Sequence, residues 1–303
     1  MTDLAIRVQG LVKQYGPIKA LDGLDLAVPR GVVYGFLGPN GAGKTTTMRI
    51  LTGLAQPNGG TVELFGRPFS WLDRRPLFEV GALIEAPAFY PYLSGRDNLR
   101  VLGGTGPVPP KGRIDAVLEL VGLIDRADDR YETYSLGMRQ RLGIGGALLN
   151  DPSLLLLDEP ANGLDPAGIR AIRELFGVLA GQGKTILVSS HILPEIQLMA
   201  DEVAIIAKGR LVESGALHQL LGETSEVRIR VTPDQVSSAT TVLDRTGLET
   251  LGVNGRGPGW ITVRADASKA PEINRALVTA GVDVAGLESG SDLETLFLSL
   301  TEG

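Results

Sequence analysis

A run of small residues early in the chain has the spacing of a phosphate-binding loop. Its members are Gly38, Pro39, Asn40, Gly41, Ala42, Gly43, Lys44, Thr45 and Thr46. The run fits the pattern G-x-x-x-x-G-K-[ST] at every fixed position. Glycines let backbone N–H groups turn towards phosphate oxygens, and the lysine adds positive charge there. We predict that the segment binds a nucleotide, with Lys44 on its β- and γ-phosphates and the Thr45 hydroxyl on Mg²⁺.

The segments on either side of this loop support that interpretation. Residues 32–37 form a short apolar run typical of a buried strand, and residues 46–54 have the pattern of a helix. A helix N-terminus behind the loop adds partial positive charge for the phosphates. A glycine-rich turn without a ligand is the alternative, and the strand–loop–helix context disfavours it.

A second chemical pattern follows the apolar run of residues 154–157, where Asp158 and Glu159 stand in sequence. Ligands of open α/β sheets bind at the carboxyl ends of the strands. We predict that Asp158 holds Mg²⁺ directly or through water, and that Glu159 polarises the water that attacks the γ-phosphate. An acidic turn after a core strand is the alternative, which the phosphate loop makes less favourable.

Two single residues have open interpretations. His191 comes just after a predicted strand at residues 184–189, where an imidazole could reach the γ-phosphate, although a lone histidine is more often structural or solvated. Tyr15 lies in a turn between predicted strands at residues 4–11 and 19–28. Its ring could stack on adenine or pack on the core, and spacing alone favours neither.

The remaining pattern predicts an α/β fold with two additions. Residues 86–150 show helical patterns and no convincing strand, so we expect a mostly helical insertion, with Ser94 and Ser135 as helix N-caps. Residues 223–303 alternate strand and helix patterns, which predicts a separate small α+β domain, with a ferredoxin-like arrangement as one candidate. A structural or dimer-stabilising role for this domain is favoured over ligand sensing.

Composition limits the classes of function. The chain has 303 residues, no cysteine and a net charge of −6, with most of the negative excess in residues 223–303. An acidic chain is a poor candidate for sequence-independent nucleic-acid binding, and we expect no nucleic-acid partner. The start of the chain does not resemble a signal peptide, and no apolar run approaches the ~18 residues of a membrane span. A membrane process would therefore require another chain in the bilayer.

Taken together, these motifs resemble the nucleotide-binding subunits of ATP-binding cassette (ABC) transporters over about residues 4–222. The loop at 38–46 is similar to the family's Walker A motif, residues 154–159 to Walker B, residues 162–165 to the D-loop, and His191 to the switch histidine. Residues 135–138 resemble the signature, usually Leu-Ser-Gly-Gly-Gln, which other P-loop NTPases lack. The resemblance also favours adenine stacking for Tyr15.

The resemblance implies an architecture and a mechanism. It implies a P-loop NTPase cassette at residues 1–222 with a helical subdomain at 86–150, and an accessory domain at 223–303. Two cassettes, copies or paralogues, sandwich two ATP molecules, each between Walker A of one chain and Ser135 and Gly137 of the other. ATP and Mg²⁺ are the implied cofactors. Hydrolysis then drives a separate transmembrane permease from the cytoplasmic face of the plasma membrane.

Two departures from the family pattern bear on function. The signature has Leu136 and Met138 where Gly and Gln are usual, but Ser135 and Gly137 are kept, so we expect function to survive. Glu85 replaces a glutamine that touches Mg²⁺ and the permease. A carboxylate can still bind Mg²⁺, although it adds negative charge near the phosphates.

The stretch 81–87 resembles the bacitracin and lantibiotic-immunity branch of the exporters, which implies a drug or peptide antibiotic as cargo. The sequence disfavours two other functions. A soluble ABC ATPase acting on nucleic acid or ribosomes usually has coiled-coil insertions or two cassettes in one chain, and neither is present. A regulatory module without turnover is disfavoured because the catalytic carboxylate Glu159 is intact.

Overall fold

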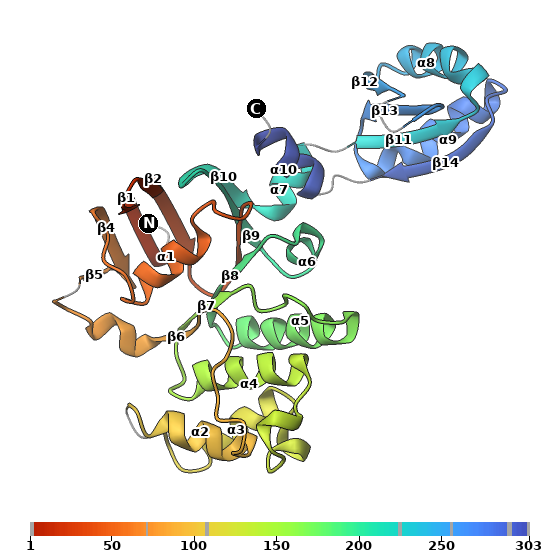
Figure 1. Ribbon diagram of the computed structural model, residues 1–303. Helices are drawn as coiled ribbons and strands as arrows, with labels where there is room; N and C mark the ends of the chain where they lie inside the picture. Colours follow the sequence, from red (N-terminus) through yellow and green to blue (C-terminus); the bar gives the residue numbers. More distant parts are fainter. Residues whose placement is uncertain are drawn as a thin grey trace. The chain divides into compact units, whose positions relative to one another are not determined.

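The computed structural model describes residues 3–70, 72–106, 109–223, 226–254, 257–289 and 293–301. The chain divides into two compact units, Met1–Ala216 and Leu217–Gly303 (Figure 1). The sequence analysis placed a boundary after residue 222, whereas the structure assigns helix α7 (Leu217–Glu223) to the second unit. The helix follows directly on strand β10, so no turn or change in composition marks the division.

A six-stranded sheet in the order β10-β9-β3-β8-β7-β6 forms the centre of the first unit. Its strands are β3 (Val33–Leu37), β6 (Val80–Leu83), β7 (Leu154–Asp158), β8 (Thr185–Ser190), β9 (Glu202–Ala207) and β10 (Arg210–Ala216). All pairings are parallel except that of the edge strand β10. Every residue of β3, β7 and β8 is buried, because both faces of the sheet are covered.

A second, antiparallel sheet covers the helix that follows the glycine loop. It has the order β2-β1-β4-β5, with β1 (Leu4–Tyr15), β2 (Ile18–Pro29), β4 (Gly59–Leu64) and β5 (Arg67–Phe69). Helix α1 (Lys44–Leu51) buries Met48 and Leu51 in one apolar core with side chains of both sheets. The two predicted N-terminal strands are confirmed and are longer than predicted, while the three-residue strand β5 was not predicted.

The described residues between 86 and 150 contain helices and no strand. These helices are α2 (Gly95–Gly103), α3 (Arg113–Leu120) and α4 (Leu136–Leu148). The two expected caps are present, because the Asp97 amide donates to Ser94 Oγ at 3.0 Å and the Met138 amide donates to Ser135 Oγ at 3.3 Å. Helix α4 packs on β6 and β7, and α2 and α3 lie beyond it (Figure 1).

Two more helices complete the first unit. Helix α5 (Pro166–Gly181) packs against β8 and β3, and the short helix α6 (Leu193–Gln197) follows β8. Short 3₁₀ turns occur in both units: η1 (Arg75–Glu79), η2 (Ile124–Arg126), η3 (Tyr131–Thr133), η4 (Pro233–Gln235) and η5 (Ala267–Lys269). None of the helices in the described ranges is long and apolar enough to cross a membrane.

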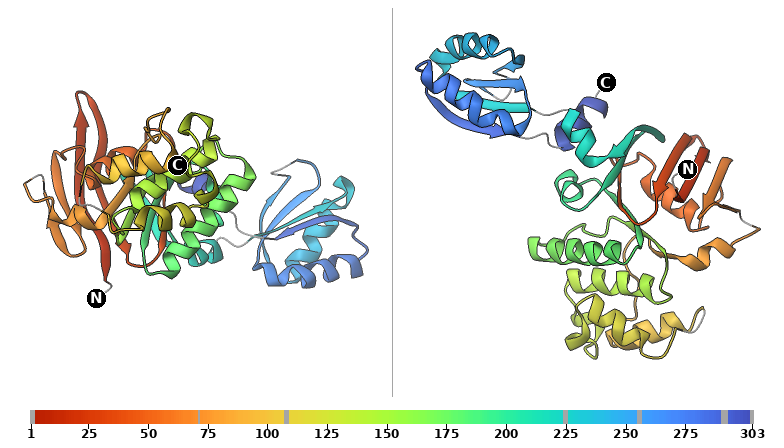
Figure 2. Two further views of the ribbon diagram at one scale, coloured as in Figure 1. Left: turned by 90° about the horizontal axis from the view of Figure 1, so that it is seen from below. Right: turned by 180° about the vertical axis from the view of Figure 1, so that it is seen from behind.

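The second unit contains a strand–helix–strand–strand–helix–strand core. Its elements are β11 (Glu226–Val231), α8 (Val236–Arg245), β12 (Glu249–Val253), β13 (Trp260–Arg264), α9 (Ala270–Thr279) and β14 (Val284–Ser289). The antiparallel order β12-β13-β11-β14 is the ferredoxin-like arrangement. Strand β12 was missed because it is an edge strand with a glycine and exposed apolar residues. Helix α10 (Leu293–Thr301) lies beside α7 (Figure 2).

Close contact between β6 and α4 makes Gly81 a sensitive position. A Cβ atom there would lie 2.1 Å from the carbonyl oxygen of Ala147, which is fixed in helix α4. We expect Gly81→Ala to lower the stability of the first unit by about 1–3 kcal/mol. Gly177→Ala is the matched control, because that exposed helical glycine has open space, and we expect a gain of about 0.5–1 kcal/mol. Thermal unfolding of both variants tests this, and an unchanged melting temperature for Gly81→Ala contradicts it.

Candidate nucleotide site

A cavity of about 530 Å³ opens over the loop between β3 and α1. Loop residues 39–46 line it together with Glu159, Asn162 and His191, and residues 18–20 of β2 close another side. The structure therefore brings the predicted phosphate loop together with the predicted catalytic carboxylate and the predicted histidine, both of which lie more than a hundred residues further along the sequence.

The loop needs glycine for its shape. Gly43 has φ 111°, and a Cβ atom there would lie 2.6 Å from Leu21 Cδ2 and 2.8 Å from the Ala20 carbonyl oxygen. A Cβ atom on Gly38 would lie 2.5 Å from the carbonyl oxygen of Ile206. The close packing fixes the loop at the start of α1, whose first-turn amides have no partner inside the helix and carry partial positive charge.

The buried ammonium of Lys44 is the positive centre of this cavity. Its side chain is 6 % exposed, and Nζ donates to the Gly38 carbonyl at 2.7 Å and lies 3.4 Å from Glu159 Oε1. A burial this deep requires partners for the charge. The residues fit a phosphate group, because phosphate oxygens can take the place of these acceptors beside the loop amides.

Asp158 and Glu159 have different environments. Asp158 is buried at the end of β7 and accepts a hydrogen bond from Ser189 Oγ at 2.5 Å. Glu159 has a left-handed backbone, φ 49°, and its amide donates to Ser189 Oγ at 3.0 Å. This backbone carries the Glu159 carboxylate towards Lys44 and His191.

His191 completes the group. Its Nδ1 lies 2.8 Å from Glu159 Oε2, and its side chain is 37 % exposed. Glu159 is thus held between a lysine and a histidine, one on each carboxylate oxygen. Such a carboxylate is oriented to accept a proton from a water molecule at the phosphate loop.

Glu195 and Ser189 also lie near this group, and neither was predicted from the sequence. Burial raises the pKa of Glu195, the neighbouring Glu159 raises it further, and His191 opposes the change. Its Oε2 is buried and has no hydrogen-bond partner in the part of the chain that the structure describes. Glu195 lies in the short helix α6, which begins two residues after His191, so the two residues are also close in the sequence. Ser189 contacts Asp158. In the sequence it is marked only as a polar residue near the end of an apolar strand.

A metal ion here would depend on the nucleotide as well as on the protein. No group of three or more His, Cys, Asp or Glu side chains suited to a metal ion occurs among the described residues. The Thr45 hydroxyl and the Asp158 carboxylate remain as oxygen ligands. Mg²⁺ is usually bound by one or two protein oxygens, and phosphate and water oxygens fill the rest of its coordination sphere. Thr45 and Asp158 therefore fit that ion.

Tyr15 and Glu85 are among the predicted residues that do not line the cavity. Tyr15 is 43 % exposed, and Lys13 Nζ lies 4.8 Å from the centre of its ring. Glu85 forms an ion pair with Arg49 and is 60 % exposed. The predicted roles of Tyr15 and Glu85 therefore need a rearrangement of their side chains or a further ligand contact.

The predicted signature residues occupy a different cavity. Ser135 and Gly137 line a space of about 470 Å³ with Leu164 and Asp165, and no residue of the loop 38–46 lines it. Ser135 Oγ accepts the Met138 amide, and its own proton remains available for an acceptor. One chain therefore does not bring the signature to its own phosphate loop.

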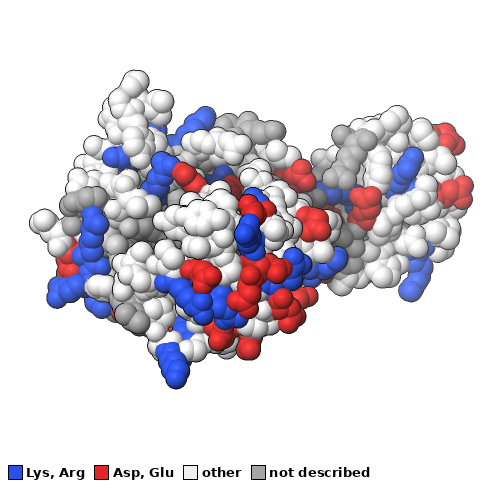
Figure 3. Space-filling view, turned by 60° about the horizontal axis from the view of Figure 1, so that its bottom comes forward, with Lys and Arg blue, Asp and Glu red and all other residues white. Residues whose placement is uncertain are grey.

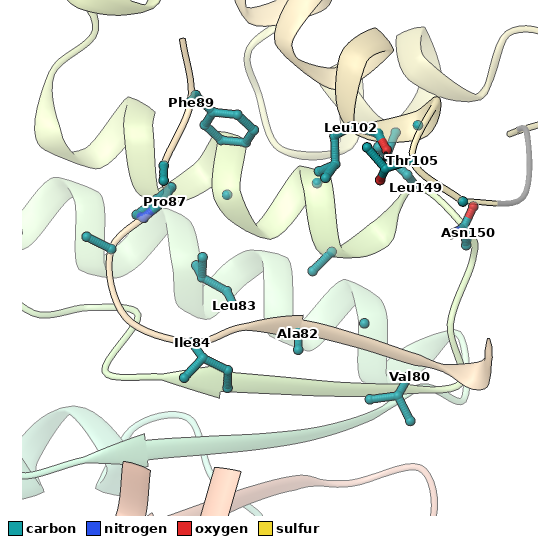
Figure 4. Close-up of a pocket in the computed structure, with 18 residues that line it drawn as sticks. Val80, Ala82, Leu83, Ile84, Pro87, Phe89, Leu102, Thr105, Leu149 and Asn150 are labelled. Atoms are coloured by element: carbon teal, nitrogen blue, oxygen red, sulfur yellow. Dashed lines mark hydrogen bonds between the residues drawn. The ribbon is translucent and has the colours of Figure 1, made fainter. Parts of the chain in front are cut away.

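A third cavity, of about 440 Å³, lies between β6 and α4, and its lining includes the residues on either side of Glu85 (Figure 4). Leu83, Pro87 and Phe89 face it from the chain that leaves β6, and Leu102 faces it from the helical segment (Figure 4). On the face shown in Figure 3, basic and acidic side chains are interspersed and form no continuous basic surface.

A parallel sheet with a glycine loop before α1, and with two carboxylates at the end of β7, defines a P-loop nucleotide-binding cassette. Comparison with known proteins agrees. A family model described as ABC transporter matches residues 21–162. The chain is similar to the bacitracin transport ATP-binding protein BcrA of Bacillus licheniformis, with 39 % identity over 98 % of this chain and 97 % of that protein.

Two other similarities extend this result. The lantibiotic transport ATP-binding protein SrtF of Streptococcus pyogenes is 42 % identical over 68 % of this chain and 89 % of its own length. The solved structure of cbiO1 from Clostridium perfringens, part of the ABC transporter complex cbiONQ, has a TM-score of 0.66 at 25 % identity, over 81 % of this chain and 98 % of that one. The chain belongs to the ATP-binding proteins of ABC transporters, whose cassette hydrolyses ATP, and the predicted fold class is confirmed.

Proposed function

We propose that this chain powers an exporter of a drug or peptide antibiotic by hydrolysing ATP on the cytoplasmic face of the plasma membrane. The observation that carries the proposal is the convergence of Lys44, Glu159 and His191 on the glycine loop. The named functions of similar proteins, bacitracin and lantibiotic transport, support the cargo class. A soluble ATPase acting on nucleic acid or ribosomes gains no support from these relatives or from the net charge of −6.

In the proposed mechanism the loop amides and Lys44 hold the β- and γ-phosphates. Mg²⁺, bound by Thr45 and Asp158, supplies charge compensation for the phosphate oxygens. Glu159 accepts a proton from the attacking water, and His191 orients the Glu159 carboxylate through its Nδ1. Ser189 holds the Asp158 carboxylate and the Glu159 backbone, because its Oγ donates to Asp158 and accepts from the Glu159 backbone amide.

The proposed active assembly has two such chains. The separation of Ser135 and Gly137 from the loop 38–46 within one chain supports this, because a head-to-tail pair can place the signature of one chain against the phosphate loop of the other. Tyr15 is proposed to stack on the adenine, since its ring is half-exposed beside the site.

ABC ATPase subunits work with transmembrane permease subunits. We propose that the cavity of Figure 4 receives a cytoplasmic segment of that permease. Its apolar side chains fit an apolar residue of such a segment, and Ile84 and Ala86, which flank Glu85, both line the cavity. Binding there can therefore act on the loop that joins β6 to the helical segment.

Removing the proposed base separates binding from turnover. In Glu159→Gln the amide cannot accept the proton from water, so we expect ATP hydrolysis to fall by at least about 100-fold while ATP binding persists. A phosphate-release assay and binding of a fluorescent ATP analogue measure the two effects. The exposed Glu174→Gln of helix α5 is the control and should hydrolyse ATP as the wild type does. Unchanged turnover in Glu159→Gln contradicts the assignment.

The composite site predicts complementation between defective chains. Lys44→Ala removes the phosphate charge, and Ser135→Ala removes the signature hydroxyl, so each variant alone should be nearly inactive. A mixed pair has one site with both defects and one site with neither. We expect the mixture to recover up to about a quarter of wild-type ATPase activity, the value for one intact site in half of the pairs. No recovery would show that the two sites are not shared between copies of this chain.

The permease proposal predicts a specific membrane partner. We expect the tagged chain, purified from native membranes, to bring down a protein with several membrane spans, identified by mass spectrometry. Phe89→Arg places a charge in the cavity of Figure 4, so its recovery of that protein should fall by about 10-fold while ATP binding is kept. Val178→Arg, on the exposed side of α5, is the control. Recovery of ribosomes or nucleic-acid proteins instead supports the soluble alternative.

A further inference from the structure

Arg49 of helix α1 forms an ion pair with Glu85, the residue that follows β6 by two positions. Glu85 has φ 65°, in the left-handed region that non-glycine residues rarely adopt. The backbone at this point is strained, and the side chain it carries pairs with Arg49 of helix α1. Glu85 is also a position where this chain departs from the family pattern described above.

The sheet places Glu85 near the phosphate site. Strands β6 and β7 are parallel, and Leu83 is opposite Leu157 in the register. The two residues after Leu83 therefore follow the same sheet edge as Asp158 and Glu159. A carboxylate at this edge has two possible partners, the cation Arg49 or a metal ion on the phosphates, and in this structure the partner is Arg49.

Arg49 lies between two regions of the site. Its pKa is raised chiefly by its hydrogen bond to Glu85, and the Tyr15 phenol adds a smaller effect in the same direction. On the other side of Glu85, residues Ile84, Ala86 and Pro87 line the cavity of Figure 4. Arg49 thus contacts Glu85 in the loop at the proposed permease cavity and lies near Tyr15, the residue proposed to stack on adenine.

We propose that Arg49 is a positioning residue that holds the Glu85 carboxylate away from the phosphate site, and that Mg²⁺ with ATP competes with Arg49 for this carboxylate. The inference rests on the proposed function. Both side chains are about half-exposed, and exposed ion pairs contribute little stability. The pair is therefore weak enough to be exchanged when a divalent cation arrives. Its exchange shifts the loop at residues 84–87, which couples nucleotide binding to the cavity.

The chain offers a clean reporter and a matched control. It contains no cysteine, so Ala88→Cys introduces a single labelling site on the exposed loop at the cavity. The control pair is Arg67–Glu79, whose side chains are 49 % and 45 % exposed, against 43 % and 60 % for Arg49–Glu85. A general effect of losing a surface arginine should appear equally in Arg67→Gln.

The test compares Arg49→Gln, Arg49→Lys, Glu85→Gln and Arg67→Gln in the labelled Ala88→Cys background. The label's fluorescence reports the loop, and a titration with Mg²⁺ at a fixed concentration of a fluorescent ATP analogue reports metal affinity without turnover. In the parent, nucleotide with Mg²⁺ should shift the label. Arg49→Gln should show that shift without nucleotide and should need up to about 5-fold less Mg²⁺. Arg49→Lys and Arg67→Gln should follow the parent.

Glu85→Gln breaks the same pair from the other side. It should also release the label without nucleotide, but it should need more Mg²⁺ than Arg49→Gln, because the carboxylate is lost. If Arg49→Gln does not fold, this variant decides the question through the label alone. The inference is overturned if either Arg49→Gln or Glu85→Gln behaves in the same way as the control Arg67→Gln. Failure of the parent to bind the analogue, or equal binding by Lys44→Ala, overturns the proposed function itself.

Discussion

The buried ammonium of Lys44 is the interaction on which the site depends. A charge with 6 % exposure is stable only with close partners, and here they are the Gly38 carbonyl and the Glu159 carboxylate. The first partner requires the loop to turn back over the start of α1. The second requires the end of β7 to lie two strands from β3. The glycine loop, the sheet order and the left-handed backbone of Glu159 all serve this one arrangement.

The proposed functions of phosphate binding, signature contact and permease contact lie in three separate cavities of the first unit. The phosphate loop, the signature residues and the space after Glu85 are lined by different residues, and no cavity combines the first two. A single chain therefore has the parts of an ATPase without a closed active site. In the proposed assembly, hydrolysis depends on a second chain, and the third cavity gives the proposed permease segment access to the same loop. This separation gives a physical basis for coupling.

Contacts within the structure accommodate two residues in which this chain departs from its family pattern. Leu136 replaces a glycine of the signature, and its Cδ2 lies 3.1 Å from where a Cβ atom on Gly163 would be, so the leucine packs over a glycine of the D-loop. Gly163 has φ 75°, a conformation that also favours glycine. Signature and D-loop are thus joined by an apolar contact. The Glu85 substitution has a counterpart as well, because Arg49 neutralises the added carboxylate.

The sequence by itself determined the chemistry and most elements. The G-x-x-x-x-G-K-[ST] spacing predicts the loop because its geometry is local, and the continuous apolar runs of β7 and β8 predict buried strands. Capping by Ser94 and Ser135 is local too, and both caps are present. The tertiary structure alone decided which side chains meet. Glu85 contacts Arg49, and Glu195 lies near Glu159, because strands and helices distant in sequence pack together. Edge strand β12 and the division after Ala216 also followed from long-range packing, which residue patterns do not encode.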